Sequence, residues 1–360
     1  MMTIKTVARQ TTPLCFMPDG RLVCYKRGKV KVMKDGNAAL EFRIPLSYKE
    51  HLFGWSRLAT RLFRFGIRAA IAMDNNHILL SIGNKIHELS FKDGSFSNGF
   101  SLPKGTRPLQ FSSISSIKGF VDGFYFGGYV HNPNKAPVEL FRRTKEDKWE
   151  VVYTFPQGTT NHIHNIVADA FRNCLWVFTG DFGDAAAIWR IKDNFNSVER
   201  YAFGNQCWRG SVVFVTEEGV LYATDTPRAK DYLFLLIPET RELNKITALD
   251  GSCIYGCQWK DNYVLATTVE SDGGDMGFLK KWLGRKRGKG IKDDYVHMIF
   301  GNTKDGFREI FKERKDFLPF TPFQFGTIKF PAGFNSGDTL YFQPVATINN
   351  DQRLMAIESL

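Results

Sequence analysis

The sequence predicts an all-β fold in which seven antiparallel sheets form a closed ring. An apolar strand, a short turn and a second apolar strand recur along the chain. The units begin near Arg68, Ser115, His162, Arg209 and Tyr255, so the repeat is 46 or 47 residues long. Within the units, apolar and polar residues alternate at a period close to two, which is typical of strands and not of helices. A constant period of this length, with several short strands per unit, is typical of a β-propeller.

The two ends of the chain complete the ring. Residues 14–36 form an early unit with Asp-Gly turns, and residues 325–360 supply only three strands. We expect the leading segment TIKTVA to pair with this last unit as its fourth strand, because the pairing would remove exposed sheet edges. The expected fold is therefore a seven-bladed propeller in one domain, residues 1–360, with six or eight blades less favoured.

Composition limits the classes of function. The chain has 360 residues, of which 43% are hydrophobic, so it can bury a large core without cofactors or disulfides. No apolar run reaches 18 residues and the first residues alternate like a strand, so we expect a soluble, cytoplasmic protein. We expect the six cysteines to be reduced core thiols. The net charge of +11 favours a partner that carries phosphate, acidic polymer or anionic lipid.

Two insertions, residues 47–66 and 270–294, interrupt the repeat, and both are basic and amphipathic. Such segments, with Trp and Phe on the apolar face, are typical of helices that lie in a membrane interface, where each basic residue contributes about 1 kcal/mol. The residues expected to bind an anionic membrane are Trp55, Arg57, Arg61, Arg64, Phe278, Lys280, Lys281, Trp282, Arg285, Lys286 and Arg287. The alternative for the first insertion is a helix that caps the ring with solvated arginines. No nucleic-acid motif is present, so no nucleic-acid partner is expected.

Propeller topology places both insertions on one face. The first lies in a link between the outermost strand of one blade and the innermost strand of the next, and the second follows a second strand. Both kinds of link open on the same rim of the ring. That rim also receives the start of every innermost strand and the end of every second strand.

Polar residues at these strand ends are the candidate site. The catalytic candidates are His162, His164, Arg209, Asp181 and Asp225. The substrate-binding candidates are Tyr129, Gln206, Trp208, Tyr255, Glu270 and Gln324. Two carboxylates suit the acid and base of glycoside hydrolysis, and a His/Tyr pair with an arginine suits cleavage of a uronate. The cofactor is left open, with a divalent metal at His162 and His164 as one option.

Each candidate also has a purely structural interpretation. Asp181 and Asp225 can cap turns by accepting backbone N–H bonds. His162 and His164 can be hydrogen-bonded core groups, and Arg209 can be the buried ion-pair partner of a carboxylate.

Residues 139–153, ELFRRTKEDKWEVVY, resemble a degenerate Asp-box, the S-x-D-x-G-x-T-W hairpin of sialidase-like propellers; Asp147 and Trp149 remain, but the Ser, Gly and Thr positions are lost. More broadly, the segments GFYFGGY, HIHNIVAD, LWVFTGD, QCWRGSVVF, LYATDTP and KDFLPFTPFQFGTIKFP resemble a bacterial group of sialidase-like (BNR-type) propellers that accompany surface-polysaccharide biosynthesis genes. The resemblance covers about residues 110–345 and implies a glycan ligand. Sialidases need three site arginines, and only Arg209 is a candidate, so sialidase activity itself is not expected.

The sequence thus predicts a cytoplasmic propeller, peripheral on the inner membrane, that processes a glycan or lipid-linked glycan in surface-polysaccharide synthesis. Hydrolase-type or lyase-type cleavage is the favoured activity. A non-catalytic glycan-binding or scaffold propeller is the alternative.

Overall fold

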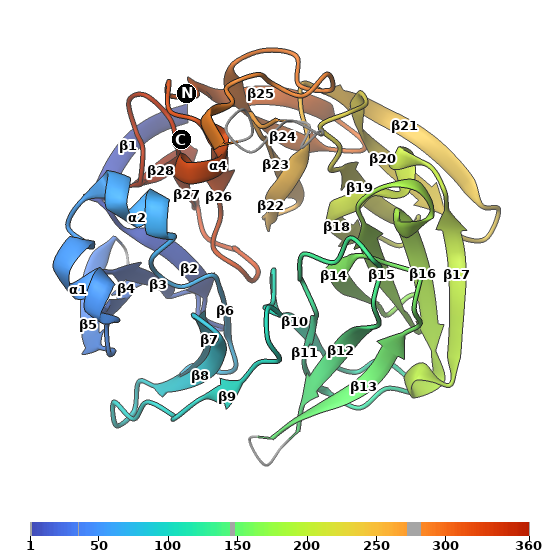
Figure 1. Cartoon of the computed structure of the whole chain (residues 1–360), viewed down its shortest axis with the longest axis horizontal. Helices are drawn as coiled ribbons and strands as arrows, with labels where there is room; N and C mark the ends of the chain where they lie inside the picture. The colour runs from blue at the N-terminus through green and yellow to red at the C-terminus, as the bar shows by residue number, and fades with distance from the viewer. Residues whose placement is uncertain (1, 35, 145–147, 272–281, 360) are drawn as a thin grey trace.

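The computed structural model describes residues 2–34, 36–144, 148–271 and 282–359, which form seven four-stranded antiparallel sheets around a central axis (Figure 1). The predicted seven-bladed propeller is confirmed. In six of the sheets the innermost strand is the first in sequence and the following strands pair outward in order, whereas in the seventh the N-terminal strand of the chain is outermost. The start of the third unit differs from the prediction, because Ser115 follows the innermost strand of its blade and does not begin it.

The strands fall into blades in chain order. The first two blades contain β2 (Thr12–Phe16), β3 (Leu22–Lys26), β4 (Lys29–Lys34), β5 (Asn37–Arg43), β6 (Ala69–Ala72), β7 (His77–Ile82), β8 (Lys85–Ser90) and β9 (Phe100–Ser101). The next two contain β10 (Ser112–Ile114), β11 (Gly123–Gly127), β12 (Val138–Arg143), β13 (Trp149–Phe155), β14 (His162–Asp169), β15 (Cys174–Gly180), β16 (Ala187–Lys192) and β17 (Ser197–Phe203). Blades five and six contain β18 (Gly210–Val215), β19 (Val220–Thr224), β20 (Asp231–Ile237), β21 (Glu242–Leu249), β22 (Cys253–Trp259), β23 (Asn262–Thr267), β24 (Tyr295–Asn302) and β25 (Gly306–Arg314). Blade seven contains β26 (Thr327–Lys329), β27 (Thr339–Val345), β28 (Arg353–Ser359) and β1 (Met2–Arg9).

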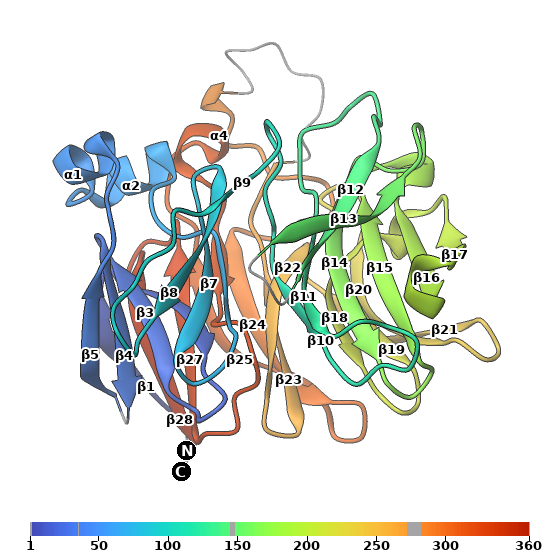
Figure 2. The ribbon, with the colours of Figure 1, turned by 90° about the horizontal axis from the view of Figure 1, so that it is seen from below.

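The two ends of the chain close the ring, as the sequence predicts. β1 pairs antiparallel with β28, from Met2 opposite Ser359 to Arg9 opposite Arg353. The N- and C-termini consequently lie side by side (Figures 1 and 2). Because the first and last strands share one sheet, unfolding of either end would open blade seven and expose its edge.

The core lies between neighbouring blades. Every residue of β15 is buried, whereas six of the seven residues of the outer strand β5 are exposed. Between blades four and five, Trp176, Phe178 and Tyr222 pack in one apolar cluster. All six cysteines are free thiols, and only Cys207 is not fully buried. The expected role of the cysteines as core thiols is therefore confirmed for five of the six.

The hairpin that resembles an Asp-box is present as β12 and β13. Trp149 begins β13, and its ring lies 5.1 Å from Phe126 and 6.0 Å from Phe100, centroid to centroid. Asp147 lies outside the described residues.

Three short helices lie on one side of the ring, which we call the upper face (Figure 2). Helices α1 (Tyr48–Phe53) and α2 (Arg57–Phe63) occupy the link from β5 to β6, and α4 (Phe320–Phe323) occupies the link from β25 to β26. Ser47 and Ser56 cap α1 and α2 by accepting backbone N–H bonds. The first insertion thus forms two helices and not one, and α2 ends at Arg64, whose left-handed φ of 54° stops it before Gly66.

One arginine of α2 faces the protein interior, which differs from the prediction. Arg61 is only 2% exposed and pairs with Asp316 and Asp351, while its Nε donates to the Phe323 carbonyl at 2.7 Å. Leu58 and Leu62 of the same helix are 51% and 38% exposed. The prediction of Arg61 as a membrane-binding residue is therefore wrong, because the carboxylates of Asp316 and Asp351 hold its guanidinium inside the protein.

Of the second insertion the structure describes residues 270–271 and 282–294, and Phe278, Lys280 and Lys281 lie outside the described residues. Trp282 is 43% exposed and Leu283 is 63% exposed. The exposed Arg285 and Lys286 follow in an irregular segment. Arg287 is tied to the propeller instead, since its Nε lies 2.7 Å from Asp294 Oδ1 and its Nη1 donates to the Ile291 carbonyl at 3.1 Å.

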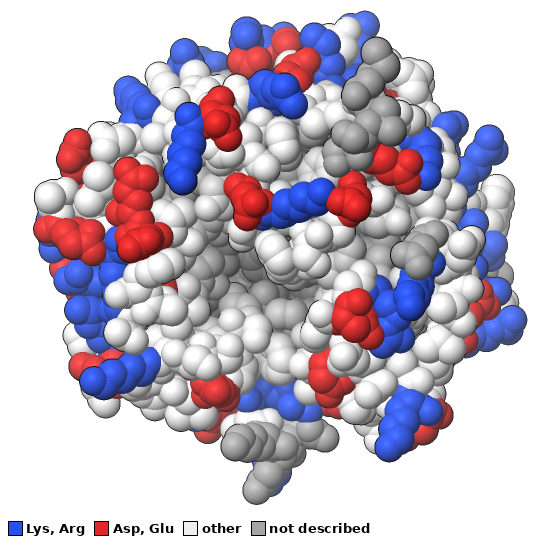
Figure 3. Space-filling model, turned by 180° about the vertical axis from the view of Figure 1, so that it is seen from behind, with Lys and Arg blue, Asp and Glu red and all other residues white. Residues whose placement is uncertain are grey.

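The opposite, lower face carries Lys, Arg, Asp and Glu interspersed around an uncharged central hollow (Figure 3). Charge of one sign does not gather there. Among the described residues, no helix is long and apolar enough to cross a membrane.

Candidate functional site

A cavity of about 260 Å³ opens on the upper face at the centre of the ring, and we call it the mouth. Links that precede inner strands and ends of second strands supply its walls, as propeller topology predicts. The charged and polar lining residues are Arg64, Arg68, Arg107, Tyr129, His164, Arg209, Asp225, Tyr255, Glu270, Gln324, Thr327 and Lys329. The end of α2 and the candidate histidine strand therefore border the same opening.

His162 and His164 begin the innermost strand of blade four and meet side by side. Their Nε2 atoms lie 3.0 Å apart, and the ring centroids lie 4.9 Å apart. The prediction that strand alternation places both rings together is confirmed. Both are nearly enclosed, however: His162 is 5% exposed and His164 is 3% exposed, and only His164 borders the mouth. Burial first, then the nearby His164 and Arg209, lower the pKa of His162 despite its contact with Asp181.

Asp181 joins the two imidazoles. Its Oδ1 lies 3.2 Å from His162 Nε2, 3.8 Å from His164 Nε2 and 3.2 Å from Arg209 Nη2. Burial raises the pKa of this carboxyl, but its contacts with both histidines and the charge of Arg209 outweigh burial, so the pKa lies well below its usual range. The main chain is also fixed, because the Asp181 N–H donates to Asn161 Oδ1 at 2.9 Å. Asp181 is therefore an ionised carboxylate that His162, Arg209 and Asn161 hold in place, and it is not a turn cap.

Arg209 connects Asp181 to the second candidate carboxylate, Asp225. Its Nη2 lies 3.8 Å from Asp225 Oδ2, which also accepts a hydrogen bond from Ser211 Oγ at 2.9 Å. Burial lowers the pKa of Arg209, and the charges of Asp225 and Asp181 raise it by more. Its Nε is buried and has no hydrogen-bond partner among the described atoms. Arg209 thus takes the role of a buried ion-pair partner, with one donor left unused.

Glu270 is the unusual acid of the site. Thr268 Oγ1 donates to its Oε1 at 2.8 Å. Burial, followed by repulsion from Asp225, raises the pKa of Glu270 to about 7. A carboxyl with such a pKa exchanges a proton near neutrality, which is the requirement for a general acid.

The remaining sequence candidates divide into two groups. Tyr129, Tyr255 and Gln324 line the mouth as expected. Gln206 supports the site from behind, because its Nε2 donates to the Asp181 carbonyl at 3.0 Å. Trp208 is wrong as a substrate-binding candidate: it does not border the mouth and packs against the apolar cluster between blades four and five.

Four cations form one wall of the mouth; the sequence predicted none of them there, and it predicted Arg64 only as a membrane-binding residue. This cationic wall consists of Arg64, Arg68, Arg107 and Lys329. None of the four pairs with a described acidic side chain. Desolvation lowers the pKa of Arg64, of Arg68 and of Lys329, and the neighbouring cations lower each further. Arg64, Arg68 and Arg107 all precede inner strands. The criterion that predicts His162 at the mouth, its position at the start of an inner strand, also predicts these three arginines there.

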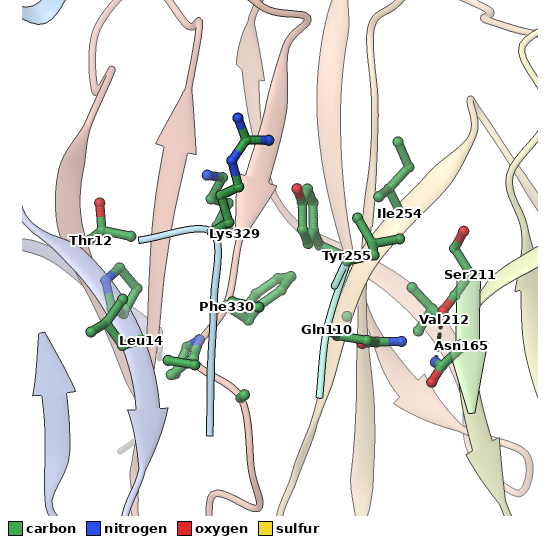
Figure 4. A pocket seen from close by; sticks show the side chains of 18 of the residues that line it. Thr12, Leu14, Gln110, Asn165, Ser211, Val212, Ile254, Tyr255, Lys329 and Phe330 are labelled. Atoms are coloured by element: carbon green, nitrogen blue, oxygen red, sulfur yellow. Dashed lines mark hydrogen bonds between the residues drawn. The ribbon is translucent and has the colours of Figure 1, made fainter. Parts of the chain in front are cut away.

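The mouth continues into a second cavity of about 180 Å³ along the axis (Figure 4). Lys329 and Tyr255 lie on opposite sides of this space, and both also line the mouth. Deeper in the channel, Asn165 Nδ2 donates to the Ser211 carbonyl at 2.9 Å and links the inner strands of blades four and five. The channel is therefore polar at the mouth and lined below mainly by Thr12, Leu14, Gln110, Val212, Ile254 and Phe330.

No known family model matches the sequence, and no curated protein matches it. Solved structures do match in fold. The β-propeller domain of Cps50 (Swd1) from Myceliophteria thermophila has a TM-score of 0.58 at 11% identity, covering 99% of this chain and 98% of that chain. The AfRom2 CNH domain has a TM-score of 0.54 at 6% identity, covering 99% of both chains. The extracellular domain of the putative one component system BT4673 from B. thetaiotaomicron has a TM-score of 0.56 at 12% identity, covering all of this chain and 40% of that chain. At these identities the likeness shows the propeller fold alone.

Proposed function

We propose that the protein is a glycan-binding propeller that receives an acidic sugar chain, bearing carboxylate or phosphate groups, in the mouth of its upper face. The observation that carries this proposal is the cationic wall of four side chains without carboxylate partners. Like charges held close together repel, and a bound anion relieves that repulsion. Arginine is also the side chain best suited to grip a carboxylate or phosphate with two parallel hydrogen bonds.

The other walls of the mouth suit the rest of a sugar. Tyr129 and Tyr255 offer aromatic faces and hydroxyls, and Gln324 offers an amide. Burial raises the pKa of both tyrosines, so their hydroxyls stay protonated and can donate hydrogen bonds. An acidic glycan also agrees with the net charge of +11 and with the resemblance to sialidase-like propellers.

Cleavage of the bound glycan is a second candidate function, and Glu270 favours it. Its pKa of about 7 beside the carboxylate of Asp225 provides a proton donor and a base in one site, which is the pairing that glycoside hydrolysis requires. The near-complete enclosure of His162 and His164 favours binding without catalysis by these two rings. Binding is therefore the primary proposal.

Binding is tested by titration calorimetry with oligogalacturonate and with a neutral oligosaccharide of equal length. We expect the acidic chain alone to bind, and the double variant Arg68→Ala/Arg107→Ala to weaken it at least about tenfold, since each charge-assisted contact contributes about 1.5–3 kcal/mol. Arg308→Ala, which removes an exposed arginine from the outer strand β25, is the matched control. Equal affinity for the neutral chain, or unchanged binding by the double variant, would contradict the proposal.

We also propose that the upper face docks on an anionic membrane, and we propose the cytoplasmic surface of the inner membrane as its location. Helices α1 and α2 turn their apolar side chains outward; the exposed ones are Tyr48, Leu52, Phe53, Trp55, Leu58, Leu62 and Phe63. The exposed basic residues Lys49, Arg57 and Arg64 lie on the same two helices or at their end. This combination is typical of interfacial helices. Docking of this face would bring the mouth against the bilayer, where lipid-linked glycans are found.

Flotation with vesicles of 30% phosphatidylglycerol in phosphatidylcholine tests the docking. We expect the wild-type protein to float with the vesicles at low salt. We expect the variant Trp55→Ser/Leu58→Ser to remain in solution. The control is Phe171→Ser, which removes an equally exposed aromatic ring, 58% accessible, from a link on the lower face. Docking is excluded if the wild-type protein stays in solution at low salt, where charge attraction is least screened.

A further inference from the structure

Three hydrogen-bond acceptor atoms converge at the start of blade four. The Nε2 atoms of His162 and His164 lie 3.0 Å apart, and Asp181 Oδ1 lies 3.2 Å from the first and 3.8 Å from the second. All three atoms lie within 4.8 Å of one another, and no other such group of three His, Cys, Asp or Glu side chains occurs in the described part of the chain.

The backbone fixes which nitrogen of each ring carries the hydrogen. His162 Nδ1 lies 3.2 Å from the Val130 carbonyl oxygen, and His164 Nδ1 lies 3.1 Å from the Gly210 carbonyl oxygen. A carbonyl oxygen can only accept a hydrogen bond, so each Nδ1 must be the N–H. A neutral imidazole has one N–H, and both Nε2 atoms therefore present lone pairs. Two lone pairs and a carboxylate oxygen that face one another need a positive species between them.

The distances suit a metal ion. Zinc binds histidine nitrogen and carboxylate oxygen at about 2.0–2.2 Å, so neighbouring ligand atoms of a tetrahedral site lie about 3.3–3.5 Å apart. The three observed distances bracket that value. Histidines that bind metals also commonly donate their second ring N–H to a backbone carbonyl, which fixes the tautomer and the ring plane. Both rings here do so.

The surrounding charges allow a dication. Asp181 and Asp225 contribute two negative charges, and Arg209 contributes one positive charge; its Nη2 lies 3.2 Å from Asp181 Oδ1. Next to two neutral imidazoles the cluster is thus negative before an ion binds. The rings are also held in place: Tyr129 lies 4.2 Å from His162, centroid to centroid, and a Cβ at Gly180 would lie 2.5 Å from His164 Cε1.

From this convergence we propose that His162, His164 and Asp181 bind one divalent transition-metal ion, with Zn²⁺ as the ion that the two-nitrogen, one-oxygen donor set favours. Three protein ligands leave a fourth position for water or for an oxygen of a ligand. The metal proposal stands apart from the glycan proposal, because it depends on none of the residues of the cationic wall. The competing occupant is a proton shared between the two rings.

Calorimetric titration of the chelator-treated full chain with Zn²⁺ at pH 7.5 tests the site, followed by Co²⁺ loading to read the visible d–d absorption of a low-coordinate site. We expect one ion per chain, and a dissociation constant at least about 100-fold higher in Asp181→Asn and in His164→Gln. His131→Gln, which changes an exposed histidine, is the control and should bind as the wild type does. Glycan affinity is measured on the same proteins, so that failure of one proposal is distinguished from failure of the other.

The proposal is overturned if the wild-type chain binds no Zn²⁺ at a 1:1 ratio, which is the result expected for the shared proton. It is also overturned if folded Asp181→Asn binds as tightly as the wild type. If both variants fail to fold, two measurements on the wild-type protein still test metal binding: the visible spectrum with Co²⁺ and the ¹⁵N shifts of the histidines. Metal binding must shift the Nε2 resonances and leave both Nδ1 atoms protonated.

Discussion

Arg61 of α2 lies 3.5 Å from Asp351 of the β27–β28 link, Nη1 to Oδ2, and it also pairs with Asp316. This contact joins the first insertion to the last blade across the upper face. It holds the one inward-facing arginine of α2 inside the protein and leaves Leu58 and Leu62 in contact with solvent. The proposed membrane-docking surface therefore depends on a buried ion pair beneath it.

Replacing Arg61 with methionine should lower the free energy of unfolding by about 3–5 kcal/mol, because it leaves the buried Asp351 without its buried cation and Asp316 with Lys315 alone. Urea unfolding measures the loss. The matched control is Arg57→Met, which removes the same charge 3.7 Å from the same Asp351 carboxylate but from a side chain that is 54% exposed. That control should cost less than about 1 kcal/mol. Equal costs for the two substitutions would show that Arg61 is not the anchor.

The fold can be predicted from the sequence because each blade repeats the same pattern of short strands with alternating apolar and polar residues. The alternation in HIHNIVAD and LWVFTG predicts β14 and β15, and the three-stranded last unit predicts that β1 closes the ring. Strand pairing follows from these patterns, since a shift by one residue would turn every buried side chain outward.

The insertions and the cationic wall are harder to predict for a physical reason. Arg57 and Arg61 both lie in α2, but which face of a short helix is buried depends on partners distant in sequence, here Asp316 and Asp351. Likewise, Arg68 and Lys329 look like ordinary surface cations in sequence. Their shared lack of a carboxylate partner is visible only when strands from blades two and seven meet at the mouth.

Gly180 should be essential to the geometry of the histidine pair. A Cβ at this position would lie 2.5 Å from His164 Cε1 and 2.6 Å from His164 Nε2, so Gly180→Ala must displace the imidazole. We expect a loss of about 1–3 kcal/mol in the free energy of unfolding, together with loss of Zn²⁺ binding.

A double-mutant cycle with His164→Ala isolates this contact. In the His164→Ala background the added methyl meets an empty space, so Gly180→Ala should cost at least about 1 kcal/mol less there than in the wild type. If the two effects simply add, the methyl is accommodated elsewhere and the ring is not displaced.

Binding of an acidic glycan should weaken as Lys329 loses its charge. Desolvation, with the nearby Arg64 and Arg68, lowers the pKa of Lys329 to about 8. A bound anion raises that pKa again, so affinity for oligogalacturonate should be constant below about pH 7 and fall up to about tenfold by pH 9. Lys329→Arg keeps the charge throughout this range and should bind with a flat pH profile between pH 7 and 9. A flat profile in the wild type would mean that Lys329 does not contact the anion.

Glu270 should make the protein less stable as pH rises toward 8. Its pKa is about 7 in the folded chain, above the ordinary value of 4.5, because burial and the charge of Asp225 disfavour the ionised form. A raised folded pKa means that the stabilising contribution is fully present below pH 4.5 and is lost as pH rises through 7. The loss attributable to Glu270 between pH 5 and 8 should be on the order of 1–3 kcal/mol.

Glu270→Gln removes the ionisation but keeps an oxygen that can accept the Thr268 hydrogen bond at the same position. Relative to the wild type, the variant should therefore gain free energy of unfolding between pH 5 and pH 8, as measured by urea unfolding at both values. The difference between the two proteins cancels the titration of all other groups. Asp225→Asn provides the second check, because removal of the neighbouring charge should move the same loss to lower pH. If the difference in the free energy of unfolding between the wild type and Glu270→Gln stays constant with pH, Glu270 is already ionised in the folded protein at pH 5. The proposed cleavage would then lack its proton donor.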